Sequence, residues 1–197
     1  MIGIKNLKLA VLSGIALMFL FAFSNKKSDN SDKWLTKTGK ITFKSTADEE
    51  IITAVSNQAG LVFSQTSGNI VVSIPIKSFI FEKKLMQTHF NENYMESGKY
   101  PNATFSGIIN KIGTINFGKD TTYDVSCTGQ LTMHGQTKPL VIKGTIKISK
   151  NANALINCNF DVKLADYKID RPKLMLKKIA ENINITLESD CSKFAKK

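Results

Sequence analysis

Apolar and polar residues alternate along most of this chain. The longest run is residues 123–133, where odd-numbered positions are apolar or glycine and even-numbered positions are polar. Alternation of this kind gives a β-strand one apolar and one polar face. It recurs in segments 40–44, 70–76, 103–109, 140–148, 156–164 and 183–187. With the less regular segments 50–56 and 61–65, the pattern predicts eight or nine antiparallel strands.

Short turn-forming sequences separate these segments, at residues 67–69 (SGN), 118–120 (GKD) and 134–136 (HGQ). Turns of this length join antiparallel neighbours. Many strands with short connections are typical of a barrel or a sandwich, so the predicted fold class is all-β. Three glycines lie on the apolar faces, at Gly107, Gly129 and Gly144. They indicate either strand bends at barrel corners or room for a ligand.

One amphipathic helix interrupts the strands, at residues 82–94. Apolar residues recur at helical spacing there and just beyond, at Leu85, Met86, Phe90 and Met95. Gly98 and Pro101 end this segment, because proline disfavours continuation of a helix. Residues 173–180, which follow Pro172, are interpreted as either a second, weaker helix or a loop.

The predicted inward faces carry no charged residue across six strand segments. Two interpretations follow, a core filled by side chains or a lumen that holds one ligand. A ligand in such a lumen would have to be apolar, because each unpaired polar group costs about 2 kcal/mol or more. Each buried CH₂ group contributes about 0.8 kcal/mol, which favours a long lipid over a small polar metabolite.

The first 24 residues have the pattern of an export signal. Lys5 and Lys8 precede an apolar run of 15 residues, 9–23, and Ala22-Phe23-Ser24 is a small-x-small cleavage pattern. We therefore expect a cleaved signal peptide and a periplasmic or secreted protein, with an uncleaved anchor as the alternative. The first cysteine is Cys127, so a lipoprotein is not expected. The predicted organisation is a signal peptide (1–24), a polar leader (25–33), one barrel domain (34–190) and a basic tail (191–197).

The chain is basic, with a net charge of +11, which falls to about +9 without Lys5 and Lys8. This charge is consistent with solubility or with transient contact with an anionic membrane surface. Nucleic acid is not an expected partner, because the lysines are spread evenly and no aromatic-interleaved basic patch occurs. The oligomeric state is left open.

Three cysteines occur, of which Cys127 and Cys158 fall on the apolar side of their strands. They are either buried small apolar residues or partners in a cross-barrel disulfide, a bond that an exported protein can form. Because three is an odd number, at least one thiol, such as that of Cys191, stays free or pairs with another chain.

No catalytic or metal-binding motif is present. The chain has two histidines, His89 and His134, and neither has a second histidine or cysteine at ligand spacing. Each is interpreted as a polar surface or hydrogen-bonding residue. The nucleophile-elbow, zinc-protease and phosphate-loop sequences are missing as well. We therefore predict that the protein is not an enzyme and holds no metal.

Two longer strings carry a family resemblance: KYPNATFSG at residues 99–107 and GQLTMHGQTK at residues 129–138. The shorter string GKITF precedes them at residues 39–43. The three strings, in their order along the chain, resemble the YceI-like family, and the resemblance covers residues 34–188. The resemblance implies a lipocalin-like, extended antiparallel β-barrel of about eight strands with one amphipathic helix. It further implies a bound polyisoprenoid chain, such as the tail of an isoprenoid quinone, and no defined reaction or catalytic cofactor.

The family offers no short polar binding motif, so ligand-lining positions are predicted from strand and helix faces alone. They are Phe43, Ile74, Phe79, Phe81, Leu85, Phe90, Phe105, Met133, Phe160 and Leu164. Plain core packing is an equal interpretation for each. The predicted function is that of an exported binding protein for a long apolar lipid; the alternative is a filled-core structural or protein-interaction module that acts through its basic surface.

Overall fold

A computed structural model describes residues 32–149 and 153–194 of the chain. The strands are β1 (Lys33–Thr46), β2 (Ile51–Ser64), β3 (Asn69–Pro75), β4 (Ile80–Phe81), β5 (Asn102–Ile109), β6 (Thr121–Met133), β7 (Gln136–Ile148), β8 (Asn153–Lys163) and β9 (Asn182–Lys193). The helical elements are α1 (Lys84–His89), a π-helical turn η3 (Phe90–Tyr94), and the 3₁₀ turns η2 (Ile76–Ser78), η4 (Ile112–Thr114), η5 (Leu164–Tyr167) and η6 (Lys173–Met175).

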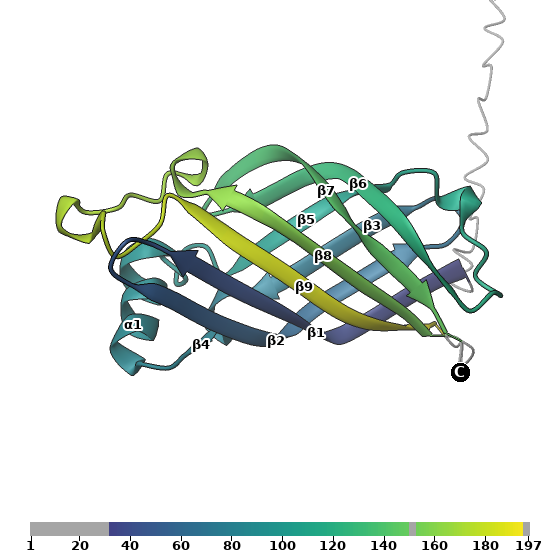
Figure 1. Ribbon diagram of the computed structural model, residues 1–197, viewed down its shortest axis with the longest axis horizontal. Helices are drawn as coiled ribbons and strands as arrows, with labels where there is room; N and C mark the ends of the chain where they lie inside the picture. Colours follow the sequence, from purple (N-terminus) through teal and green to yellow (C-terminus); the bar gives the residue numbers. More distant parts are fainter. Residues whose placement is uncertain (1–31, 150–152, 195–197) are drawn as a thin grey trace, which may run out of the picture.

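Eight of the strands close into an antiparallel barrel (Figure 1). Around the ring the order is β1-β9-β8-β7-β6-β5-β3-β2, and β2 pairs back with β1. The two-residue strand β4 pairs with the first half of β2 through Ala54 and Phe81. Closure leaves the barrel without an unpaired edge. The predicted all-β barrel of about eight strands is confirmed.

The two ends of the barrel differ. At one end, which we call the open end, lie the β1–β2 turn, α1 and η3, the β6–β7 hairpin and the segment between β8 and β9 (Figure 1). At the other end three aromatic rings meet: Trp34 lies 6.2 Å from Phe63 and 5.6 Å from Phe117 between ring centroids. The indole nitrogen of Trp34 donates a hydrogen bond to Gln65 Oε1 at 2.8 Å. This aromatic plug closes the second end, which we call the closed end.

Side chains fill the closed half of the barrel. Ile146 and Ile148 at the end of β7, Ala154 at the start of β8 and Cys191 at the end of β9 are almost fully buried. A filled core, one of the two interpretations of the apolar faces, therefore describes this half.

Two facing glycines allow a close strand approach next to the filled half. Gly107 of β5 pairs with Gly129 of β6. A Cβ atom on Gly129 would lie 2.4 Å from the carbonyl oxygen of Ser106 and 2.7 Å from Cζ of Phe105. The ring of Phe105 thus occupies the space that two side chains would otherwise fill, so this pair of glycines allows a close strand approach and does not leave room for a ligand.

Two strands extend beyond the predicted bounds of the barrel domain. Strand β9 continues to Lys193, past the predicted domain end at residue 190, because the alternation of buried residues extends through Cys191. The first strand begins at Lys33, inside the predicted leader. The predicted signal peptide lies outside the described residues. Within residues 32–149 and 153–194, no helix has the length and apolar character needed to cross a membrane.

The predicted helix at residues 82–94 corresponds to α1 followed by η3. The second helical candidate, residues 173–180, has only the 3₁₀ turn η6 and is otherwise a loop. All three thiols are free, so the structure contains no cross-barrel disulfide between Cys127 and Cys158.

Candidate functional site

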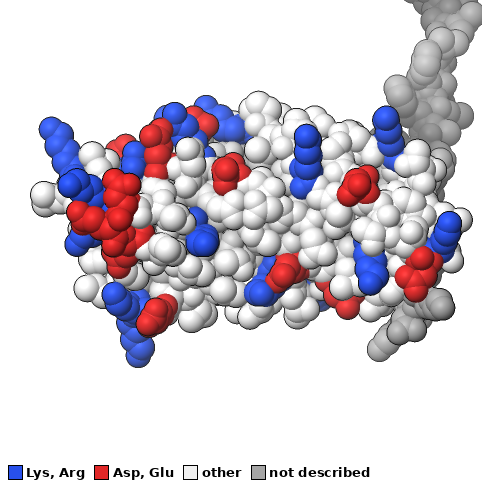
Figure 2. Space-filling model, viewed as in Figure 1, with Lys and Arg blue, Asp and Glu red and all other residues white. Residues whose placement is uncertain are grey.

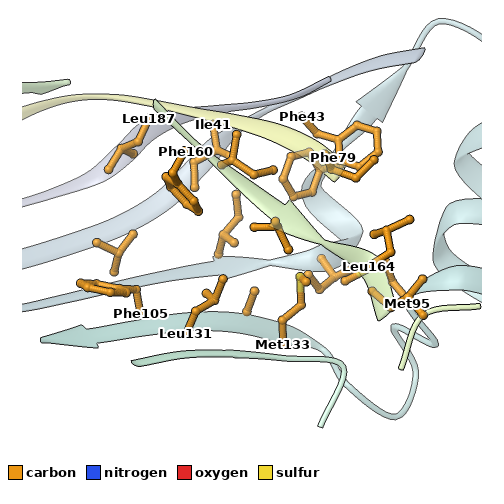
Figure 3. Close-up of a pocket in the computed structure, with 18 of the residues that line it drawn as sticks. Ile41, Phe43, Phe79, Met95, Phe105, Leu131, Met133, Phe160, Leu164 and Leu187 are labelled. Carbon is orange, nitrogen blue, oxygen red and sulfur yellow. The ribbon is translucent and has the colours of Figure 1, made fainter. Parts of the chain in front are cut away.

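An inner cavity of about 120 Å³ occupies the open half of the barrel. Inward residues of β1, β3 and each of β5 to β9 line it, together with residues from η2, η3 and η5. Every lining side chain is apolar except the thiol of Cys158. In Figure 3 the labelled side chains point toward one another from opposite walls, with Phe105 and Leu187 farthest from the helix. The strand alternation produces this lining, because each inward position is apolar.

A second cavity of about 350 Å³, the mouth cavity, lies at the open end. The β1–β2 turn, β4, α1, η3 and residues 164–179 surround it. Its lining is mixed and includes Glu50, Lys83, His89 and Lys178 beside apolar residues. The two cavities share the side chains of Phe43, Phe90, Met95, Leu164 and Ile169. These five residues form the boundary between an apolar interior and a mouth of mixed polarity.

Phe90 is at the centre of this boundary. Its ring centroid lies 5.8 Å from that of Phe43, 5.6 Å from Phe79 and 4.9 Å from Phe81. It is the first residue of η3, where a π-helical turn replaces the α-helix. Turns of this kind occur frequently at functional sites. The aromatic contacts therefore position a residue that touches both cavities.

The predicted ligand-lining positions fall in both cavities. Eight line the inner cavity: Phe43, Ile74, Phe79, Phe90, Phe105, Met133, Phe160 and Leu164. Phe81 and Leu85 line only the mouth cavity, and Leu85 is 67% exposed. Their contact with a ligand stays a prediction.

The structure adds lining residues that were not nominated. Ile41, Leu131, Ile142 and Leu187 lie on the same inward faces and follow from the same alternation. Ile169 lies in the loop after η5, where no periodic pattern exists. Only the tertiary structure brings it to the cavity.

The thiols of the barrel are poor nucleophiles. Burial raises the pKa of Cys158 to about 11 and that of Cys127 to about 11. A thiol reacts through its thiolate, which is scarce at neutral pH when the pKa is this high. Among residues 32–149 and 153–194, no three His, Cys, Asp or Glu residues gather as metal ligands would. The chemistry that the site supports is the binding of apolar groups.

The two cavities differ in what they can hold. Ligand pockets for small molecules usually measure about 300–1,000 Å³. The mouth cavity is in that range, whereas the inner cavity, at about 120 Å³, is smaller. A bulky rigid ligand therefore does not fit inside, but the end of a slender chain can enter if the boundary side chains move apart.

The sequence profile of the YceI-like domain matches residues 28–190. The chain belongs to the YceI-like family. A polyisoprenoid binding domain from Saccharophagus degradans is similar in structure, with a TM-score of 0.68 and 18% identity, over 83% of this chain and 99% of that one. BcnA of Burkholderia cenocepacia has a TM-score of 0.63 and 17% identity, over 78% and 96% of the two chains.

A YceI protein of Campylobacter jejuni has a TM-score of 0.50 and 19% identity, over 93% of this chain and 97% of that one. No curated protein matches the sequence significantly. The YceI-like family is a binding family that is not known for catalysis. That this member catalyses no reaction stays a prediction.

Both strings that carried the YceI-like resemblance meet at the open end. Nδ1 of His134 donates a hydrogen bond to the carbonyl oxygen of Tyr167 at 2.8 Å, and Nε2 lies 3.2 Å from Glu96 Oε1. The ring of Tyr100 contacts the imidazole edge-on, with centroids 4.9 Å apart. His134 is buried. Of the two roles predicted for it, the structure therefore supports a hydrogen-bonding residue and not a polar surface residue. His134 connects the β6–β7 hairpin to η5 and to the turn after η3.

The other histidine is exposed in α1. Its Nδ1 lies 2.9 Å from Nδ2 of Asn93, one turn further along. His89 therefore fits the predicted polar surface residue, although it also lines the mouth cavity.

Proposed function

We propose that this protein binds one long apolar lipid of the polyisoprenoid class. The end of the chain occupies the inner cavity, and the polar head stays in the mouth cavity. The observation that carries this proposal is the wholly apolar lining of the inner cavity, which shares its boundary residues with a mouth of mixed polarity. The similar domain from Saccharophagus degradans, described as polyisoprenoid binding, supports the same ligand class.

Free-energy magnitudes favour a long chain over a short one. Each CH₂ group moved out of water contributes about 0.8 kcal/mol. Association opposes binding by roughly 4–15 kcal/mol, and micromolar affinity needs about 8 kcal/mol net. These values together require roughly 15–30 carbon-sized groups. A lipid of several isoprene units meets this requirement, and isoprenoid quinones and related polyisoprenoids are the ligands we expect.

The chain has a preferred direction in the barrel. The aromatic plug of Trp34, Phe63 and Phe117 closes the far end. Polar headgroups lose less hydration in the mouth, beside Glu50, Lys83 and Lys178, than among the apolar residues inside. The tail therefore enters first.

Export belongs to the same proposal. A cleaved signal at residues 1–24 would deliver the barrel to the periplasm or the medium, where lipid must cross an aqueous space. Mass spectrometry of the protein isolated from its own cells tests this, because cleavage near Ser24 removes a defined mass.

Lipid extraction is the first test of binding. Protein purified from its own cell envelope is extracted with organic solvent, and the extract is analysed by mass spectrometry. A stoichiometric prenyl lipid supports the proposal. An empty extract, together with no uptake of a fluorescent polyprenyl probe, overturns it.

A variant pair tests whether the probe occupies the inner cavity. Ala103 lines this cavity, whereas the neighbouring Thr104 lies on the outer face of β5. Ala103→Leu fills the space and should weaken probe binding by about tenfold or more. Thr104→Leu adds similar apolar bulk outside and should leave binding unchanged. Equal effects of the two substitutions would place the probe elsewhere.

A further inference from the structure

Large apolar side chains are exposed around the mouth cavity. Leu174 is 89% exposed, Leu85 67% and Ile51 63%, and Met175 and Leu176 are exposed as well. We call these five residues the apolar rim. Leu174 to Leu176 lie in the loop that begins with η6, Leu85 lies in α1, and Ile51 follows the β1–β2 turn. Exposed apolar residues that gather at one place mark an interaction surface.

The rim belongs to one structural unit at the open end. Leu85 and Met175 line the mouth cavity from opposite elements. The backbone N–H of Glu49 donates a hydrogen bond to the carbonyl oxygen of Lys177 at 2.9 Å, which connects the β1–β2 turn to the η6 loop. Figure 1 shows this loop and α1 at the same end of the barrel. Elsewhere on the described residues, the large exposed apolar side chains are Ile80 of β4, Val71, Ile108 and Val141 on the barrel wall, and Phe194 at the closed end.

Basic residues accompany the apolar rim. Lys173 and Lys177 flank Leu174 to Leu176, and no acidic residue occurs between Arg171 and Lys178. Figure 2 shows lysine, arginine and acidic residues together at this end. Two of the acidic residues are engaged: Glu181 pairs with Lys163 at 2.9 Å and with Arg171 at 3.6 Å, and Glu50 lies 3.9 Å from Lys83. None of the ion pairs within residues 32–149 and 153–194 uses Lys173 or Lys177.

We propose that the apolar rim docks on the surface of an anionic lipid bilayer, with the mouth cavity facing the membrane. Exposed leucines flanked by lysines suit the boundary between headgroups and acyl chains, since apolar residues enter it and lysines attract anionic lipids. Docking lets a lipid chain pass between bilayer and barrel without crossing water. This inference rests on the proposed lipid function for its purpose, but its test is separate.

The test is co-flotation of the isolated protein with vesicles. One set contains phosphatidylcholine alone and the other phosphatidylcholine mixed with phosphatidylglycerol. The wild-type protein should bind the mixed vesicles more tightly, and added salt should weaken this binding. The double substitution Leu174→Asp and Leu176→Asp should weaken it by about tenfold or more. Lys173→Gln with Lys177→Gln should remove most of the preference for phosphatidylglycerol. None of these four residues lines either cavity.

Val141→Asp with Ile108→Asp is the matched control, because Val141 is 61% exposed but lies on the barrel wall. Circular dichroism should show that all variants fold. The inference is wrong if the rim substitutions leave vesicle binding unchanged. It is also wrong if the control substitutions reduce vesicle binding as much as the rim substitutions do. A rim variant that changes only the oligomeric state in sedimentation also overturns the inference, because the rim would then contact a second copy of this chain.

The polyprenyl probe in solution separates the two proposals. Rim variants should still take up the probe from detergent, since their inner cavity is intact. Ala103→Leu should still float with mixed vesicles although it takes up little probe. If the wild-type protein floats with vesicles but never takes up the probe, the proposed function is wrong and membrane docking still holds. If it takes up the probe but does not float, membrane docking is wrong and the proposed function still holds.

Discussion

At the scale of single residues, the direction of each inward side chain decides whether it meets the ligand space. Phe105 and Thr104 are neighbours in β5, yet Phe105 is buried in the inner cavity and Thr104 lies on the outer face. Alternation predicted this difference from the sequence. The packing of Phe105 over Gly107 and Gly129 could not be predicted, because the facing glycine belongs to another strand.

Phe105→Asp should be severely destabilising, and Thr104→Asp should be mild. The first replaces a buried ring by an unpaired charge, which we expect to lower the free energy of unfolding by about 3–5 kcal/mol or more. The second should change it by less than about 1 kcal/mol. Urea unfolding followed by fluorescence measures both. Equal losses would mean that the strand faces are assigned wrongly.

The thiol of Cys158 should report on cavity occupancy. Burial raises its pKa to about 11, so alkylation at neutral pH should be slower than that of an exposed cysteine by roughly 100-fold. Bound lipid should slow it further, because Cys158 lines the inner cavity. Mass spectrometry of labelled peptides, with and without lipid, tests this. Cys191 lines neither cavity and provides the control, since lipid should not alter its labelling.

At the scale of elements, close strand approaches and the open-end connections shape the lumen. The pair Gly107 and Gly129 brings β5 against β6. At the open end, His134 connects the β6–β7 hairpin to η5 through a hydrogen bond to Tyr167. The chain positions of β5, β6 and the β6–β7 hairpin were predictable from periodicity and turn residues, whereas η5 was not predicted. The contacts between these elements were not predictable, because η5 has no periodic pattern.

Gly129→Ala should disrupt this approach. The added Cβ would lie 2.4 Å from the carbonyl oxygen of Ser106 and 2.6 Å from Cα of Gly107, both backbone atoms that cannot simply rotate away. We expect a loss of about 1–3 kcal/mol or more in the free energy of unfolding.

Gly98→Ala is the control, since a Cβ there meets nothing within 4 Å. It should leave stability within about 0.5 kcal/mol or raise it slightly. Thermal unfolding compares the two variants. A stable Gly129→Ala protein would show that β5 and β6 can separate without loss.

At the scale of the whole molecule, the barrel combines a filled half and a hollow half. The closed half supplies packed core, and the open half keeps an apolar space that contributes less packing energy. Buried thiols occur in both halves: Cys158 lines the inner cavity and Cys191 is fully buried near the closed end. Their burial makes stability depend on pH.

Stability should fall as the pH rises above about 9. Burial raises the pKa of Cys127 and Cys158 to about 11 and that of Cys191 to about 12, from an ordinary value of 9.0. Between these values the folded protein keeps thiol protons that the unfolded chain has lost, so the free energy of unfolding decreases with pH. Below about pH 9 both states are protonated, and this contribution is constant.

Replacing all three cysteines by alanine should flatten this dependence. Urea unfolding at about pH 8 and about pH 10 gives the change in the free energy of unfolding with pH for the wild-type protein and for the variant. The lysines contribute equally to this change in the two proteins. A variant as pH-sensitive as the wild-type protein would assign the alkaline loss to other groups.

The sequence by itself determined the strands, their inward faces, the helix and, through two strings of residues, the YceI-like family. These are local properties, because strand period and turn chemistry depend on near neighbours along the chain. Only the tertiary structure decided which inward residues fill the barrel and which surround empty space. Ring closure, the aromatic plug and the glycine pair set that division, and each joins residues far apart in sequence. The apolar rim depends on the same long-range geometry, since alternation cannot say which loops meet at one end.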